Sequence, residues 1–161
     1  RSGEALEDYK KLMLKLNNEV VAAAPEDLLI NTHVCRGNYH STFFSSGAYD
    51  SVADLLFGEE NVNAYYLEYD DERSGGFAPL AKVSGDKKVV LGLVTTKTPA
   101  LENKELVINR IHEAAKYVPL DRLYLSPQCG FASCEIGNKL TEEEQWAKLK
   151  LVKEIAEEVW G

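Results

Sequence analysis

The chain has 161 residues, enough for one ordinary domain, and its 26 acidic and 18 basic residues give a formal net charge of −8. This charge argues against a general nucleic-acid binder and against docking on anionic lipid, because both need clustered Lys and Arg. No apolar run approaches the roughly 18 residues of a membrane-spanning helix, and the opening RSGEALEDYKK carries no targeting pattern. Three cysteines, Cys35, Cys129 and Cys134, fit reduced thiols in a cytoplasmic protein better than a disulfide framework.

A helix is predicted first, over residues 4–24, with an apolar stripe formed by Leu6, Tyr9, Met13, Leu16 and Val20. Pro25 stops it. Strands and helices then alternate. We expect, in chain order, a strand at 28–34, a short helix at 48–57 ended by Gly58, a strand at 63–70, a turn or two of helix near 77–83, a strand at 89–96, a helix at 102–117, a strand at 123–126 and a helix at 141–159.

The later helices have recognisable inward faces and one clear start signal. Thr141 followed by Glu144 is a capping box, which begins the last helix. The expected inward residues are Tyr49, Val52, Ala53 and Leu56 in the short helix, Val107, Ile111, Ala114 and Ala115 in the next, and Leu149, Val152, Ala156 and Val159 in the last.

Alternation of this kind predicts an α/β fold with a parallel sheet and crossover helices. Four strand–helix units are present, and the connection between the second and third strands has little room for a helix. Four units can form a small open sheet or half of an eight-stranded barrel.

Polar and metal-binding residue types follow each predicted strand. The four strand ends carry, in chain order, His33 and Cys35; Glu68 and 70–72; 95–97; and Ser126, Gln128 and Cys129. In parallel α/β folds the carboxyl ends of the strands meet at one edge, where functional groups gather.

Four of these residues fit a zinc site. His33 and Cys35 lie two positions apart, so both side chains can face one point, and Glu68 and Asp70 share a face in the same way. With Cys129 they supply one imidazole, two thiols and a carboxylate, a suitable set for zinc. Taken singly, each has a simpler explanation, since a buried Cys is usually packing and a strand-end Glu is often an ion-pair partner. Their convergence on one edge favours the metal site.

Other polar and aromatic residues have two interpretations or an ordinary one. Asp70 and Asp71 either hold a substrate amine or the ligand histidine, or form a solvated acidic turn with Arg73. Arg36 either meets an anionic group of a substrate or forms a surface salt bridge. The residues expected to be ordinary are His40 in a Ser-rich loop, His112 in a helix, and Tyr66 and Trp146 in the core.

Four segments of the chain are distinctive: THVCRGN, LEYDDERSG, VVLGLVTTKTP and YVPLDRLYLSPQCGFAS. Together they resemble the cobalamin-independent methionine synthase family, and especially its short, single-barrel bacterial members. The resemblance covers nearly all of the chain. It implies a TIM (β/α)8 barrel, of which residues 1–161 are a single partial domain. This domain is the C-terminal half, with four βα units preceded by one helix.

The resemblance also implies a metal site and a reaction. Family members hold zinc with an H-x-C motif, a Glu on the next strand and a P-x-C-G motif, which correspond to His33, Cys35, Glu68 and Cys129. Cys134 has no counterpart. The implied reaction transfers the methyl group of 5-methyltetrahydrofolate to homocysteine, whose thiol would be activated by zinc.

One departure from the family pattern concerns a catalytic position. Long family members carry D-x-H-S-P after the third of these strands, with a His thought to move protons, whereas this chain has TTKTP with Lys97 there. We therefore expect Lys97 and Asp70 as catalytic residues, and Asp71 and Arg36 as substrate-binding residues. The same departure leaves open a zinc-dependent alkyltransferase that joins another thiol and electrophile, such as coenzyme M and an epoxide.

A third possibility is an inactive, self-associating half-barrel. The start RSGEALEDYKK does not resemble a natural beginning, whereas EEVWG fits a natural C-terminus, so an N-terminal half-barrel is expected to be missing. A half-barrel exposes two sheet edges and an apolar face. We expect the isolated chain to dimerise or aggregate and to transfer no methyl group.

Overall fold

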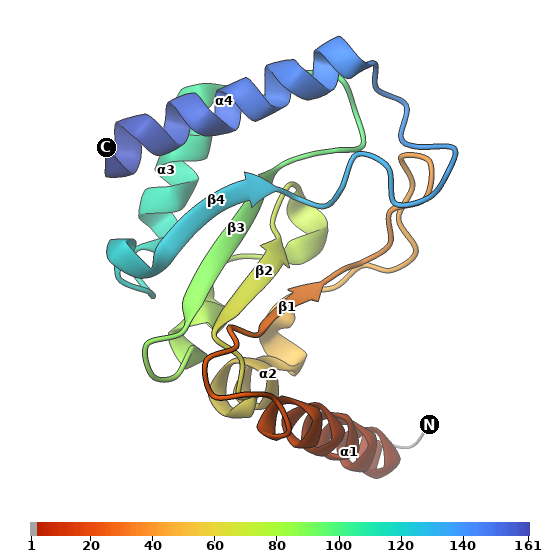
Figure 1. Cartoon of the computed structure of the whole chain (residues 1–161), viewed down its shortest axis with the longest axis vertical. Coiled ribbons are helices and arrows are strands. Elements are labelled where there is room, and N and C mark those ends of the chain that lie inside the picture. The colour runs from red at the N-terminus through yellow and green to blue at the C-terminus, as the bar shows by residue number, and fades with distance from the viewer. Residues whose placement is uncertain (1–2) are drawn as a thin grey trace.

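The computed structural model describes residues 3–161. Within them, four strands form one parallel sheet (Figure 1). Its strands are β1 (Asn31–Val34), β2 (Ala64–Glu68), β3 (Lys88–Val94) and β4 (Leu123–Pro127), paired side by side in chain order. All four strands were predicted, although β1 and β2 are shorter than expected.

The helices also follow the predicted order: α1 (Gly3–Ala22), α2 (Ala53–Glu59), α3 (Lys104–Ala114) and α4 (Glu142–Trp160). A 3₁₀ turn, Tyr49–Ser51, precedes α2, and another, Leu120–Arg122, precedes β4. Between β2 and β3 the chain forms two short 3₁₀ turns, Glu72–Ser74 and Ala78–Lys82, which confirms that this connection is poor in helix.

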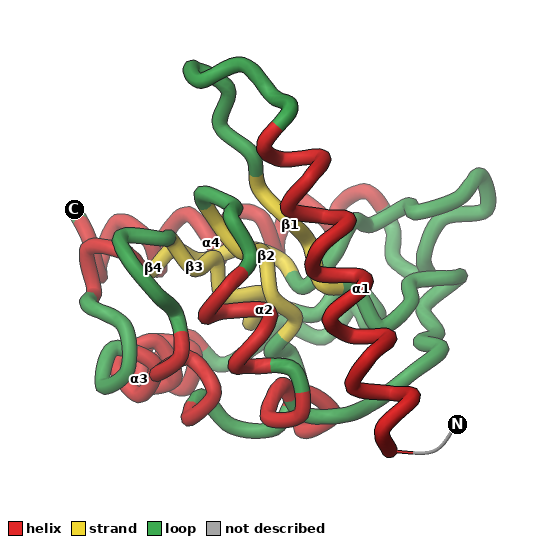
Figure 2. The backbone as a smooth tube through the Cα atoms, turned by 90° about the horizontal axis from the view of Figure 1, so that it is seen from below, coloured by secondary structure: helices red, strands yellow, loops and turns green. Residues whose placement is uncertain are grey.

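Strand alternation divides the side chains between two faces of the sheet. Tyr65, Leu67, Leu91, Leu93 and Leu123 point to the face covered by helices, where they join the buried core. Figure 2 shows α2 and α3 on the same side of the strands. Val107, Ile111 and Ala114 of α3 and Tyr49, Ala53 and Phe57 around α2 are buried in that core, as predicted for all but Phe57, which was not among the expected inward residues.

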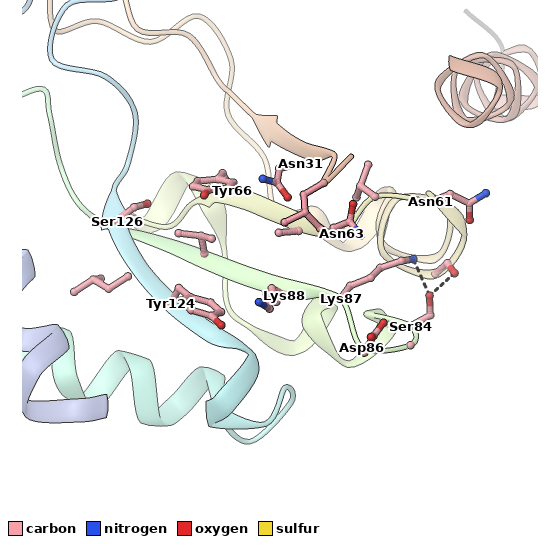
Figure 3. Close-up of a pocket in the computed structure, with 17 residues that line it drawn as sticks. Asn31, Asn61, Asn63, Tyr66, Ser84, Asp86, Lys87, Lys88, Tyr124 and Ser126 are labelled. Atoms are coloured by element: carbon pink, nitrogen blue, oxygen red, sulfur yellow. Dashed lines mark hydrogen bonds between the residues drawn. The ribbon is translucent and has the colours of Figure 1, made fainter. Parts of the chain in front are cut away.

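The opposite face of the sheet borders a broad cavity of about 830 Å³ (Figure 3). Tyr66 of β2, Lys88 and Val90 of β3, and Tyr124 of β4 line it, because each occupies the alternate parity from the core residues. Tyr66 is 41% exposed, so its predicted place in the core is wrong.

Three further expectations about helices need correction. Gly58 does not end α2, which continues to Glu59. In α4 the fully buried residues are Lys148 and Ile155, whereas Leu149, Val152 and Ala156 are only half-buried. Trp146 is 59% exposed and lies outside the core, with its indole N–H donating to Glu142.

The start of α4 follows from its local sequence, whereas α1 packs little of its surface. The Thr141 hydroxyl accepts from the Glu144 amide while the Glu144 carboxylate accepts from the Thr141 amide, so the predicted capping box is present. Helix α1 carries no fully buried residue, and its apolar stripe is exposed except at the half-buried Met13, with Leu16 44% and Val20 74% exposed. None of the helices within residues 3–161 is long and apolar enough to cross a membrane.

Candidate metal centre

His33, Cys35, Glu68 and Cys129 come together at the carboxyl edge of the sheet. One ligand atom from each lies within 4.8 Å of the ligand atoms of the other three. In the register of β1 and β2, His33 pairs with Tyr66 and Val34 with Leu67. The residues that follow this last pair in the chain are Cys35 and Glu68, so this register places these two residues side by side. Cys129 arrives from the loop that follows β4.

Two thiols in this group have the separation that a tetrahedral metal requires. The sulfur atoms of Cys35 and Cys129 lie 3.9 Å apart. With zinc–sulfur bonds of about 2.3 Å, tetrahedral geometry places two sulfur ligands about 3.8 Å apart. The residues present therefore fit zinc in type, number and thiol spacing.

Imidazole orientation in His33 is fixed by the neighbouring strand. His33 Nδ1 lies 3.0 Å from the carbonyl oxygen of Tyr66. A carbonyl only accepts, so Nδ1 must carry the hydrogen, which leaves Nε2 as the ring nitrogen available to a metal. This arrangement, with one ring nitrogen tied to the backbone and the other free, is typical of metal-ligating histidines.

Glu68 is fully buried and each of its carboxylate oxygens accepts a hydrogen bond. Gln128 donates its side-chain amide to Oε1 at 2.8 Å, and the backbone amide of Arg36 donates to Oε2 at 3.1 Å. The Thr96 hydroxyl donates to the Gln128 carbonyl oxygen at 2.9 Å, which fixes the amide orientation. The guanidinium of Arg36 adds a positive charge 3.8 Å from Oε2. These groups hold Glu68 at the cluster.

The bond between Gln128 and Glu68 links β4 to β2 across the end of β3. A glycine in β3, Gly92, makes this crossing possible. A Cβ at Gly92 would lie 2.7 Å from the Leu67 carbonyl oxygen and 2.8 Å from the Gln128 Cα atom. The ladder between β3 and β4 is irregular at the same place, between Gly92 and Val94. Glycine inside a strand often marks such a close backbone approach.

The surroundings of the Cys35 thiol raise its pKa. Cys35 is exposed as a residue, but partial burial of the thiol raises its pKa, and the charges of Cys129 and Glu68 act in the same direction. The Gly37 amide, which donates to the sulfur at 3.2 Å, opposes the rise. Without a metal this group is therefore a protonated thiol at neutral pH, and metal binding must release its proton.

A cavity of about 310 Å³ adjoins the candidate ligands. Its lining includes His33 and Cys129 together with Tyr66, Ser126 and Gln128. Tyr66 and Ser126 also line the larger cavity along the open sheet face (Figure 3), so the two cavities share part of their lining. A small molecule in this space would contact the thiol and imidazole ligands directly.

The sequence matches the family model described as the catalytic domain of cobalamin-independent synthase over residues 14–158. The chain belongs to this family. It is 52% identical to the uncharacterized protein YxjG of Bacillus subtilis over 98% of this chain and 42% of that protein. A methionine synthase of Pyrococcus horikoshii is 29% identical over 63% of this chain and 26% of that protein.

Two solved structures described as B12-independent methionine synthases have folds similar to that of this chain. A putative vitamin-B12 independent methionine synthase from Listeria monocytogenes has a TM-score of 0.73 and 42% identity, covering 94% of this chain and 41% of that one. A B12-independent methionine synthase from Shewanella, in complex with selenomethionine, has a TM-score of 0.71 at 22% identity, covering 91% of this chain and 42% of that one. The chain thus spans about two-fifths of the length of YxjG and of these two solved structures. The predicted fold class, parallel βα units of the C-terminal half of a (β/α)8 barrel, is confirmed.

Arg36 is buried beside Glu68 of the cluster and does not lie on the surface. It is 6% exposed, and its guanidinium donates to the Gly47 carbonyl oxygen and to the Tyr49 hydroxyl. The alternative of a surface salt bridge is therefore wrong. A substrate-binding role for Arg36 stays a prediction, and the observed bonds show it ordering the Gly47 loop beside Glu68.

The two aspartates that follow β2 both bind Arg73. Asp70 accepts from its Nη2 atom at 3.1 Å, and Asp71 accepts from its Nε atom at 2.6 Å. The Asp70 side chain is 1% exposed, and burial raises its pKa while Arg73 opposes the rise. These contacts correspond to the turn with Arg73 that the sequence left open, although Asp70 is buried and not solvated. Catalysis by Asp70 and substrate binding by Asp71 stay predictions.

Lys97 lies at the third strand end, as expected, but its ammonium group contacts a loop. It donates to the Gly37 carbonyl oxygen at 3.0 Å and to the Asn38 side-chain oxygen at 2.9 Å. Its predicted catalytic role is not tested by these contacts. Cys134 lies outside the four-residue cluster, and its exclusion from the ligands stays a prediction.

Three contributors to this site were assigned no role from the sequence. The sequence places Gln128 at a strand end and gives no role to Asn38 or Gly92. The glycine within VVLGLV was an available signal for close backbone approach. The side-chain partners of Gln128 and Asn38 depend on loop paths that strand periodicity does not specify.

Proposed function

We propose that the chain carries the zinc-binding half of a methyltransferase that moves the methyl group of 5-methyltetrahydrofolate to homocysteine, giving methionine. One observation supports this most strongly. The ligand atoms of His33, Cys35, Glu68 and Cys129 converge within 4.8 Å, with a thiol spacing suited to tetrahedral zinc. Membership of the cobalamin-independent synthase family supports the same reaction class.

A zinc ion held by His33, Cys35, Glu68 and Cys129 would supply Lewis acidity that lowers the pKa of a thiol substrate to give a nucleophile at neutral pH. The chain's own residues prepare for this. Tyr66 orients the His33 ring through its backbone carbonyl, while Gln128 and the Arg36 amide hold Glu68. The adjoining cavity gives homocysteine a place next to Cys129 and His33. A reducing compartment, for which we propose the cytoplasm, would keep both thiols available.

The whole reaction needs more surface than this chain provides. The chain spans about two-fifths of the length of YxjG and of the Listeria structure, and one sheet face borders an open cavity of about 830 Å³. We propose that an N-terminal half-barrel completes this face and contributes to the homocysteine and folate pocket. The chain by itself is expected to self-associate and to lack methyl transfer.

Metal analysis of the natural full-length protein tests the proposal. We expect about one zinc per chain, lost on Cys35→Ala or Cys129→Ala, and retained on Cys134→Ala. Cys134 is the matched control, because it is a free thiol five positions from Cys129 and outside the cluster. Equal zinc content in Cys129→Ala and Cys134→Ala would contradict the proposal.

Lys97, in place of the histidine of long family members, is the observation that favours a second candidate, alkyl transfer between another thiol and another electrophile. Zinc activation of the thiol would be the same. Product formation from homocysteine and methyl-folate, measured beside that from coenzyme M and an epoxide, separates the two candidates.

A further inference from the structure

Three loops that carry or adjoin the candidate metal ligands meet at one buried amide, Asn38. Asn38 is 8% exposed and lies three positions after Cys35. Figure 1 shows the loop after β1 running alongside the loop after β4. We call Asn38, Lys97, Ser133 and Asn138 the Asn38 cluster.

Each hydrogen-bonding position of the Asn38 side chain has a partner. Its oxygen accepts from Lys97 Nζ at 2.9 Å and from Asn138 Nδ2 at 3.0 Å. Its nitrogen donates to the Gly130 carbonyl oxygen at 2.6 Å and to Ser133 Oγ at 2.7 Å. A primary amide offers two donors and two acceptor lone pairs, so Asn38 is fully satisfied.

Lys97, which follows β3, adds two hydrogen bonds to the Asn38 cluster and its loop. Its Nζ also donates to the carbonyl oxygen of Gly37, so one ammonium binds both residues that follow Arg36. Lys97 is 9% exposed, and no carboxylate within residues 3–161 forms an ion pair with it. A buried ammonium satisfied by neutral oxygens is costly to replace by an apolar group that leaves those oxygens unpaired.

The Asn38 cluster connects the backbones that carry the two cysteines. On one side, Lys97 and Asn38 hold the segment just after Cys35, whose Gly37 amide donates to the Cys35 sulfur. On the other side, Asn38 binds Gly130, the residue next to Cys129. Asn138 ties the same oxygen of Asn38 to the Thr96 carbonyl. The two sulfur atoms held between these bonds lie 3.9 Å apart.

From this connectivity we infer that Lys97 and Asn38 are positioning residues that set the spacing of Cys35 and Cys129 for metal binding, and that Lys97 acts through the cysteine loops rather than on a substrate proton. The inference rests on the proposed function, since it presumes that the two thiols share a zinc ion. Outer contacts that orient metal ligands commonly contribute 10- to 100-fold to metal affinity.

Three substitutions in the natural full-length protein test the inference. Lys97→Met removes both ammonium bonds, and Asn38→Asp keeps an acceptor for Lys97 while removing the donors to Gly130 and Ser133. Lys148→Met is the matched control: Lys148 is also a buried lysine, but its ammonium binds Ala100 and Glu102 away from the metal ligands.

Zinc affinity by chelator competition and the visible spectrum of the cobalt-substituted protein are the readouts. We expect Lys97→Met and Asn38→Asp to weaken zinc binding about tenfold or more and to alter the cobalt ligand-field bands. Lys148→Met is expected to leave both unchanged, even where it lowers the melting temperature. Asn38→Asp keeps the test valid where Lys97→Met fails to fold.

Unchanged zinc affinity and cobalt spectra in both Lys97→Met and Asn38→Asp would overturn the inference. A lowered kcat with a shifted pH profile and unchanged zinc affinity in Lys97→Met would also overturn it, in favour of proton transfer. Failure of the proposed function is recognised separately, by zinc retention in Cys129→Ala.

Discussion

On the helix side of the sheet, Tyr65, Leu67 and Leu91 are completely buried, whereas on the other side Tyr66 and Tyr124 are each 41% exposed beside an open cavity. Both sets come from strands of the same sheet, and the face on which each side chain lies follows from its parity within its strand. The helix side is held by apolar packing, where missing volume lowers stability. The open side leads to the candidate ligands, where directed hydrogen bonds fix single atoms. Substitutions at adjacent residues can therefore separate fold stability from metal binding.

Leu91→Ala should have the largest effect on stability. Leu91 is 0% exposed within the core, and truncating such a residue costs about 2–5 kcal/mol through lost burial and the resulting cavity. Chemical denaturation measures the loss. Because the side chain faces away from the ligands, zinc affinity of the folded fraction should match the parent protein, and a tenfold weaker affinity would show that the two faces are not separable.

Gly92→Ala, one position further on, should affect both properties. Its Cβ would meet backbone atoms of Leu67 and Gln128 at 2.7–2.8 Å, and these cannot move without shifting β2 or the loop after β4. Overpacking of this kind costs about 1–3 kcal/mol. We also expect weaker zinc binding by chelator competition, because Gln128 would be displaced from Glu68. A Gly92→Ala protein with parental zinc affinity would show that the close approach is unnecessary for the site.

Gln128→Met should act mainly on the metal site. It removes the 2.8 Å donor to Glu68 Oε1 while keeping side-chain volume. The unpaired buried oxygen should lower stability by about 1–3 kcal/mol and weaken zinc binding about tenfold. Gln145→Met on helix α4 is the matched control and should change neither by a measurable amount. Parental zinc binding in Gln128→Met would mean that the Arg36 amide suffices to hold Glu68.

Sequence patterns predicted the ligand side of the sheet better than the packing of the last helix. Strand parity was enough to bring His33, Cys35 and Glu68 to one edge, because two-residue alternation is a property of the backbone. It was not enough for α4, where a helical apolar pattern suggested Leu149 and Val152, yet Lys148 is buried. Burial of Lys148 depends on Glu102 and the Ala100 carbonyl, groups more than 40 positions away. The partners of Asn38 were out of reach for the same reason.

Glu60 is a polar exception on the helix side and gives the smallest expected effect. It is 3% exposed, one carboxylate oxygen accepts from Asn17 at 2.9 Å, and the other has no partner in the described residues. Burial raises the pKa of Glu60, opposed by Asn17 and by the charge of Lys87. The folded chain therefore binds this proton more tightly than the unfolded chain, and stability from this group is lost as the pH rises through the folded pKa.

Glu60→Gln removes that loss while keeping an acceptor for Asn17. Thermal unfolding should show the variant more stable than the parent protein by about 1 kcal/mol at pH 8. The difference should disappear below about pH 4, where the carboxyl is protonated in both folded and unfolded chains. Glu59→Gln, at the exposed neighbouring position, should change stability by less than about 0.5 kcal/mol at either pH. A Glu60→Gln difference that does not vary with pH would locate its effect in packing and would remove charge burial as the distinguishing feature of this position.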